Sequence, residues 1–90
     1  MSKGVEIRVY GRVQGVWFRG NTQKKAADLK IKGWVRNEPD GSVLIHAFGI
    51  SKALSELQEW CQEGPTHARV EKVEVRDIPY HEYSGFAIQR

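Results

Sequence analysis

The apolar residues change their spacing near the beginning of the chain, and this change limits the folds that are open to it. Residues 5–10 place β-branched apolar side chains at every second position, a pattern that predicts a β-strand. Residues 21–31 carry apolar side chains at helical spacing, which predicts an amphipathic helix that Gly33 ends. Between them lies a loop bracketed by Gly11 and Gly15. The chain therefore begins as a strand, a glycine-containing loop and a helix.

The rest of the chain predicts a hairpin, a second helix and further strands. Residues 39–41 (PDG) are a strong turn signal, because proline fixes φ and the glycine accepts a positive φ. Leu54, Leu57 and Cys61 share one helical face. The predicted elements are strands at 33–38 and 42–48, a helix capped by Ser51 and ended by Gly64 and Pro65, and strands at 70–75 and 86–90.

This order is β-α-β-β-α-β with a short tail strand, and it predicts an α+β fold. The pattern is that of the ferredoxin-like βαββαβ sandwich, an antiparallel sheet with two helices on one face. The 90 residues suit a single domain over residues 1–90. Hydrophobic residues make up 40% and charged residues 28%, which is ordinary for a folded globular chain.

Charge and cysteine content limit the partners and the compartment. The net charge of +3 helps to attract an anionic substrate, but it is too small to indicate nucleic acid as a partner. The single Cys61 cannot form an internal disulfide, which favours a reducing compartment. The first residues do not resemble a signal peptide, and no apolar run approaches the length of a membrane span. We therefore expect a cytoplasmic protein with no membrane partner.

Several catalytic motifs are missing from the sequence. The 3 histidines, His46, His67 and His81, are scattered rather than grouped at metal-ligand spacing. The chain carries no GxSxG, Walker or dinucleotide-binding sequence. We therefore expect no metal and no cofactor.

The loop after the first predicted strand is a candidate anion site. Gly15 lets the backbone approach a ligand, and the loop runs directly into a helix N-terminus, where backbone N–H groups and the helix dipole favour an anion. Arg19 lies at the start of the helix and can bind a phosphate through two parallel hydrogen bonds. Taken alone, the same residues are equally those of an ordinary turn and a solvated arginine, so both interpretations stay open at this point.

Two longer motifs carry a family resemblance. Residues 11–19, GRVQGVWFR, resemble the first signature of the acylphosphatases, which hydrolyse the carboxyl–phosphate bond of acyl phosphates to a carboxylate and inorganic phosphate. Residues 33–43, GWVRNEPDGSV, followed by Gly49, resemble the second signature at the expected distance. Chain length and element order also agree, so the resemblance spans nearly the whole sequence. It implies a hydrolase acting on acid anhydrides, with the ferredoxin-like fold.

The resemblance also implies a site without metal or cofactor. Arg19 would bind the substrate phosphate, and Asn37 would orient the attacking water. The small-molecule acyl phosphate would be the only partner of a monomer. The phosphate-binding loop would consist of the backbone amides of Gln14, Gly15, Val16, Trp17, Phe18 and Arg19.

Three positions around this loop need separate interpretation. Trp17 fills the variable position of the first signature with a bulky ring, and Gly20 stands where larger residues are common. Both bear on substrate preference and on the rigidity of the loop. Arg12 lies at a strand end within the signature, and we expect a surface residue there rather than a catalytic one.

Two other functions compete with the hydrolase. The same element order builds RNA-binding domains, and residues 84–88 (SGFAI) resemble part of their aromatic motif. That motif belongs on an internal strand, however, whereas here it ends the chain without its second aromatic residue. The other candidate is a noncatalytic phosphate-binding module. The presence of both Arg19 and Asn37 argues against it.

Overall fold

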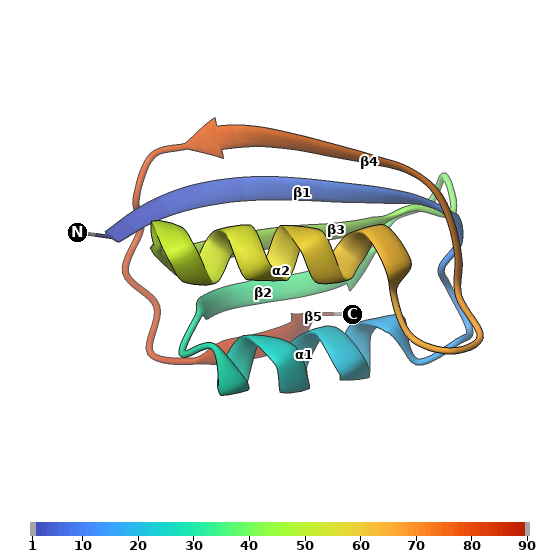
Figure 1. The fold of residues 1–90 in the computed structure, drawn as a ribbon, viewed down its shortest axis with the longest axis horizontal. Coiled ribbons are helices and arrows are strands. Elements are labelled where there is room, and N and C mark those ends of the chain that lie inside the picture. Colours follow the sequence, from blue (N-terminus) through green and yellow to red (C-terminus); the bar gives the residue numbers. More distant parts are fainter. Residues whose placement is uncertain (1, 90) are drawn as a thin grey trace.

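The computed structural model describes residues 2–89 of the chain. The elements follow in the predicted order β-α-β-β-α-β, and a short strand comes at the end (Figure 1). The elements are β1 (Ser2–Arg12), α1 (Phe18–Asp28), β2 (Lys32–Asn37), β3 (Val43–Ile50), α2 (Ser51–Glu63), β4 (Arg69–Ile78) and β5 (Phe86–Gln89).

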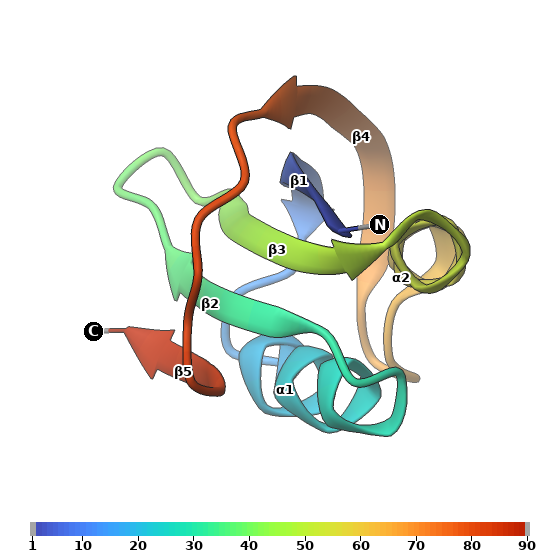
Figure 2. The ribbon, with the colours of Figure 1, turned by 90° about the vertical axis from the view of Figure 1, so that its left-hand side faces the viewer.

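The strands form one sheet in the order β4-β1-β3-β2-β5, and both helices lie against the same face of it (Figure 2). The α+β, ferredoxin-like prediction is therefore confirmed. The first four strands pair antiparallel, as expected, but β5 pairs in parallel with β2, so the sheet is mixed. The parallel pair arises because residues 79–85 carry the chain across one end of the sheet before β5 begins (Figure 1).

The core lies between the sheet and the helices. The alternating residues Val5, Ile7 and Val9 of β1 are at most 4% exposed, which confirms the period-two pattern. Leu57 and Cys61 of α2 are fully buried against them in the same cluster. Each buried aliphatic side chain contributes about 1.5–3 kcal/mol to folding. This packing holds the sheet in place, and the sheet in turn positions the ends of β1 and β2.

Two predicted helix boundaries are wrong. Helix α1 ends at Asp28 because Lys30 adopts a left-handed conformation (φ 60°), and the N–H of Ile31 then donates to the carbonyl of Ala26. Gly33 therefore does not end α1 but lies in β2. Helix α1 also begins at Phe18, before the predicted start, because Trp17 turns the chain into the helix.

The limits of α2 agree only in part with the prediction. Ser51 is the first helical residue rather than the cap, since Ile50 precedes it in an extended conformation and no side chain of residues 2–89 caps the helix. Gly64 ends the helix with a φ of 71°, as predicted. The final strand ends at Gln89, and residue 90 of the predicted strand lies outside the described residues.

Gly33 has a structural role that the second signature alone does not reveal. Its φ of 133° is one that side-chain-bearing residues rarely adopt, and a Cβ there would collide with the carbonyl oxygen of His46 on β3. Gly33→Ala is expected to lower the free energy of unfolding by at least about 2 kcal/mol, from backbone strain and overpacking together. Urea unfolding followed by tryptophan fluorescence measures this change.

Gly85→Ala is the matched control for this variant. A Cβ at Gly85 would meet no atom of the described residues within 4 Å, and its φ is not positive. Its effect is therefore expected to stay within about 0.5 kcal/mol. If Gly33→Ala were as mild as Gly85→Ala, the collision with β3 would not be the reason for glycine at position 33.

Candidate active site

The loop between β1 and α1 turns sharply at two residues. Gly15 has a φ of 75° and Trp17 a φ of 64°, so both are in the left-handed region. Trp17 is the N-cap of α1, which places Phe18 and Arg19 in its first turn. The loop predicted from the first signature therefore lies directly on a helix N-terminus.

The backbone of this loop is rich in unpaired donors. Within residues 2–89, no backbone N–H of residues 14–20 donates a hydrogen bond to a backbone carbonyl. The first N–H groups of a helix lack partners inside the helix, and successive free N–H groups form a concavity that favours anions. The loop can therefore surround a phosphate with backbone donors.

A pocket of about 320 Å³ opens beside the loop, and we call it the Arg19 pocket. It brings together Arg19 from the start of α1 and Asn37 from the end of β2. Arg19 is half-buried and forms no ion pair with a carboxylate in the described part of the chain. The pocket is lined by Val13, Gly15, Trp17, Phe18, Arg19, Gly20, Asn37 and Ile88.

Asn37 offers an acceptor that the protein does not use. Its Oδ1 is buried and has no hydrogen-bond partner among residues 2–89. An unpaired buried acceptor costs about 1–3 kcal/mol, and a bound water molecule relieves that cost. The amide oxygen is therefore free to accept a hydrogen bond from water in the Arg19 pocket.

Gln14 links the loop to the strand that carries Asn37. Its Nε2 donates to the carbonyl oxygens of Glu38 at 2.8 Å and of Ser42 at 2.9 Å. Both acceptors belong to the β2–β3 turn, immediately after Asn37. The side chain of Gln14 therefore holds the two halves of the site together, beyond the backbone role expected from the first signature.

The β2–β3 turn is itself fixed by side chains. Asp40 Oδ1 accepts hydrogen bonds from the backbone N–H of Ser42 at 2.9 Å and from its Oγ at 2.6 Å. These two bonds stabilise the carboxylate, so they lower the pKa of Asp40. The predicted turn at residues 39–41 is thus present, with a φ of 93° at Gly41.

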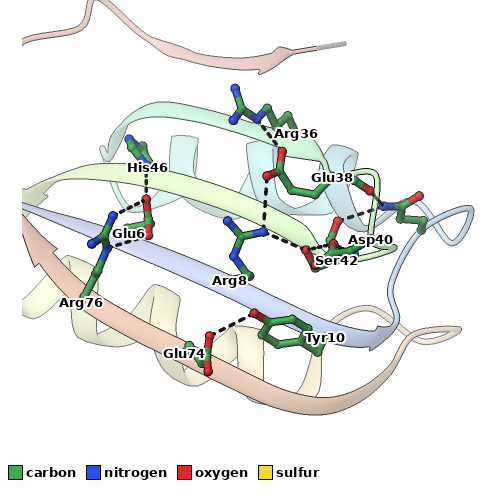
Figure 3. A network of polar contacts seen from close by, with 11 residues as sticks. Glu6, Arg8, Tyr10, Arg36, Glu38, Asp40, Ser42, His46, Glu74 and Arg76 are labelled. Carbon is green, nitrogen blue, oxygen red and sulfur yellow. Dashed lines mark hydrogen bonds and ion pairs between the residues drawn. The ribbon is translucent and has the colours of Figure 1, made fainter.

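Glu38 anchors the same turn on the sheet face opposite the helices (Figure 3). Its carboxylate accepts from Arg36 at 2.7 Å and from Arg8 at 3.3 Å, and Arg8 also donates to Ser42 Oγ at 3.1 Å. Figure 3 shows these side chains arranged from β1 across β3 to β2. The network restrains the residues that follow Asn37.

The predicted site residues divide into two groups. Gly15, Trp17, Phe18 and Arg19 line the Arg19 pocket together with Asn37. The other predicted loop residues, Gln14 and Val16, do not line it.

Val16 instead lines a second hollow, which we call the outer hollow. Trp17 and Gly15 line both spaces, so they separate one from the other. The outer hollow is lined by Arg12, Gly15, Val16, Trp17, Asn21, Pro65, Thr66 and His67. Arg12 is exposed and lies there rather than in the Arg19 pocket.

Sequence analysis did not assign Val13, Gly20 or Ile88 to the site. Val13 and Gly20 flank the loop and are buried in the structure. Ile88 comes from β5, where it lies opposite Val35 of β2. The alternation of Phe86 and Ile88 indicates a strand, but it contains no signal for which strand β5 joins.

Other chemical groups lie away from this site. Burial raises the pKa of the Cys61 thiol to about 12, so it stays protonated at neutral pH and is a poor nucleophile. Among residues 2–89, no three His, Cys, Asp or Glu side chains are grouped so that they could hold a metal ion. No helix in the same residues is long and apolar enough to span a membrane.

Comparisons with known proteins agree with the two signatures. A family model described as Acylphosphatase matches residues 5–88. A protein named Acylphosphatase from Rubrobacter xylanophilus is 53% identical over 78 residues, which cover 87% of this chain and 71% of the relative. Another, from Methylococcus capsulatus, is 44% identical over 89 residues, covering 98% and 97% of the two chains. The solved structure of an acylphosphatase from Coxiella burnetii superposes with a TM-score of 0.95 at 38% identity, covering 98% of this chain and 93% of that chain.

Proposed function

Because the chain belongs to the acylphosphatase family and therefore hydrolyses acyl phosphates to a carboxylate and inorganic phosphate, we propose that the Arg19 pocket is its active site. Arg19 and the loop amides bind the phosphoryl group, and Asn37 positions the water. One observation carries this proposal: the same pocket brings together an arginine, a loop of N–H donors and the Oδ1 of Asn37, all without a protein partner among residues 2–89.

The reaction requires the protein mainly to position the reactants and to stabilise negative charge. An acyl phosphate is an activated anhydride, and its carboxylate is a good leaving group. Phosphoryl transfer depends on positioning and electrostatic stabilisation more than on covalent catalysis. The Arg19 guanidinium and the N–H groups of the loop residues that line the pocket neutralise the equatorial phosphoryl oxygens, where charge is concentrated in the transition state.

Asn37 acts on the other reactant. Its Oδ1 accepts a hydrogen bond from water and holds the water oxygen in line with the leaving carboxylate. An amide is too weak a base to remove the proton, so its role is orientation. The water oxygen bonds to phosphorus as the bond to the acyl oxygen breaks. The carboxylate leaves with that electron pair, and the proton passes to a phosphoryl oxygen of the substrate.

One assay separates this site from phosphatases of other classes. The protein is expected to hydrolyse benzoyl phosphate with and without EDTA, and to leave 4-nitrophenyl phosphate, a monoester, essentially unchanged. The reason is that guanidinium and backbone donors carry the charge stabilisation, while the site has no strong nucleophile for a poor leaving group. Loss of benzoyl phosphate hydrolysis with EDTA, restored by a divalent cation, would contradict the proposal.

We further propose that residues 1–90 act as one domain, as a cytoplasmic monomer that does not bind nucleic acid. The compact sheet and the single buried, reduced cysteine support this arrangement. Sedimentation equilibrium tests whether the protein is a monomer, and titration with single-stranded RNA at low salt tests whether it binds nucleic acid. The structure covers the sheet face of Phe48 with Tyr80 and Tyr83, which removes part of the open surface that RNA-binding domains use for stacking.

A further inference from the structure

Trp17 is a large apolar side chain that the fold leaves in solvent. It is 77% exposed, although neighbouring Phe18 is 1% exposed. Its backbone is held firmly, because its carbonyl oxygen accepts from the backbone N–H of Asn21 at 3.0 Å and from Asn21 Nδ2 at 2.8 Å. Trp17 lies in the left-handed region, which is uncommon for a non-glycine residue and costs free energy. The stability of the fold alone therefore does not explain a tryptophan at this position.

Gly20 gives the indole ring its place. A Cβ built on Gly20 would lie 2.7 Å from Cζ3 of Trp17 and closer still to Cε3, so the ring rests directly on the glycine. Any larger residue at position 20 would push the ring away. The two departures from the family signature, Trp17 and Gly20, are therefore one structural unit.

This unit stands at the mouth of the Arg19 pocket. Val13 and Phe18 are buried and form the inner wall, whereas Trp17 is the exposed side chain of the wall. Trp17 also lines the outer hollow, so this residue lies between the two spaces. A phosphoryl group bound by Arg19 must keep its acyl group on the side away from the water held by Asn37. Trp17 is the exposed apolar side chain of this pocket, so an acyl group that extends towards solvent can meet the indole.

We propose that the Trp17 indole, seated on Gly20, is the surface on which the acyl part of the substrate packs. The unit selects aromatic or extended apolar acyl phosphates over acetyl phosphate, because only the former cover the ring. This inference rests on the proposed function of the Arg19 pocket. It makes Trp17 a residue that determines specificity, while the phosphate and the water are handled by Arg19 and Asn37.

Trp17→Ala tests the proposal through a ratio of two substrates. The variant is expected to lower kcat/KM for benzoyl phosphate by about 5–10-fold, mainly through KM, which is the scale of one lost aromatic contact. Its loss for acetyl phosphate is expected to be clearly smaller, so that the ratio of the two kcat/KM values falls, since acetyl phosphate does not reach the ring. Trp17→Phe should recover most of the benzoyl phosphate preference. Equal losses for both substrates, or no loss for either, would overturn the proposal.

Gly20→Ala tests the seat of the ring without removing it. It is expected to lower the preference for benzoyl phosphate in the same direction, by about 2–5-fold, because the ring is displaced. In the double variant with Trp17→Ala, the substitution at Gly20 should add nothing to the preference, since no ring remains to be moved. Additive effects would show that Gly20 acts independently of Trp17.

The design distinguishes two failures. If the parent protein hydrolyses neither substrate, the proposed function fails. If the parent hydrolyses both and the variants leave their ratio unchanged, only the role of Trp17 fails.

Discussion

Arg19→Ala is expected to lower kcat/KM for benzoyl phosphate by at least about 10²–10³-fold, the scale of losing one preorganised donor at the developing charge. Arg19 lines the pocket and has no carboxylate partner within the described residues, so its charge is available to the phosphoryl group. The same variant should also bind inorganic phosphate more weakly. Steady-state hydrolysis, with inorganic phosphate as a competitive inhibitor, measures both effects.

Two further variants sharpen this test. Arg19→Lys should remain poor, because an ammonium group cannot reproduce the planar guanidinium fork. Arg12→Ala is the matched control, since it removes an arginine of the same signature that lies in the outer hollow. Its kcat/KM for benzoyl phosphate is expected to stay within about threefold of the parent, because the lost charge lies outside the Arg19 pocket. Equal losses at Arg12 and Arg19 would show that the effect is one of overall charge.

Asn37→Ala is expected to reduce kcat for benzoyl phosphate by at least about 10²–10³-fold while leaving phosphate binding nearly unchanged. The substitution removes the acceptor that we propose holds the water, but it does not alter Arg19 or the loop amides. Inorganic phosphate is expected to bind more weakly to Arg19→Ala but almost unchanged to Asn37→Ala. This difference would assign Arg19 to the phosphoryl group and Asn37 to the water. Near-parent turnover, or a parallel loss of phosphate binding, would contradict the role of Asn37.

A stability measurement tests whether the loss of activity in Asn37→Ala comes from a destabilised fold. Because Asn37 Oδ1 has no partner among residues 2–89, its removal breaks no hydrogen bond at that atom. The free energy of unfolding of Asn37→Ala is therefore expected to stay within about 1 kcal/mol of the parent. Urea unfolding checks this, and a fully folded but inactive variant would locate the loss in the reaction.

Much of the fold could be predicted because local patterns carry it. The period-two residues of β1 and the helical spacing in α2 both appear in the core as expected. The wrong predictions, at the end of α1 and in the pairing of β5, arise where a local sequence signal does not determine the path of the chain. Gly33 suggests the end of a helix, but Lys30 takes the left-handed position and Gly33 is needed for close approach to β3. The parallel pairing of β5 depends on the route of residues 79–85, which no periodicity encodes.

The candidate site was predictable to the extent that single residues carry its chemistry. The two signatures point to Arg19 and Asn37, which lie in one pocket. What could not be predicted are relations between distant residues. Gln14 suggests a loop amide, yet its side chain reaches across to the β2–β3 turn. Trp17 and Gly20 look like separate departures from the family pattern, and only their contact reveals a unit.

The place of β3 between β1 and β2 has a consequence for how activity is acquired. Arg19 follows β1 and Asn37 ends β2, and in the sheet these two strands are connected through β3, with pairs as distant in sequence as Ser2 and Ile50. Such non-local pairing slows folding, because loop closure precedes the contacts that compensate for it. An early intermediate with only the first strand, loop and helix would have phosphate donors but no partner for the water. With the proposed site, we therefore expect turnover to begin only when the central strand is in place, so that activity reports on the completed chain topology.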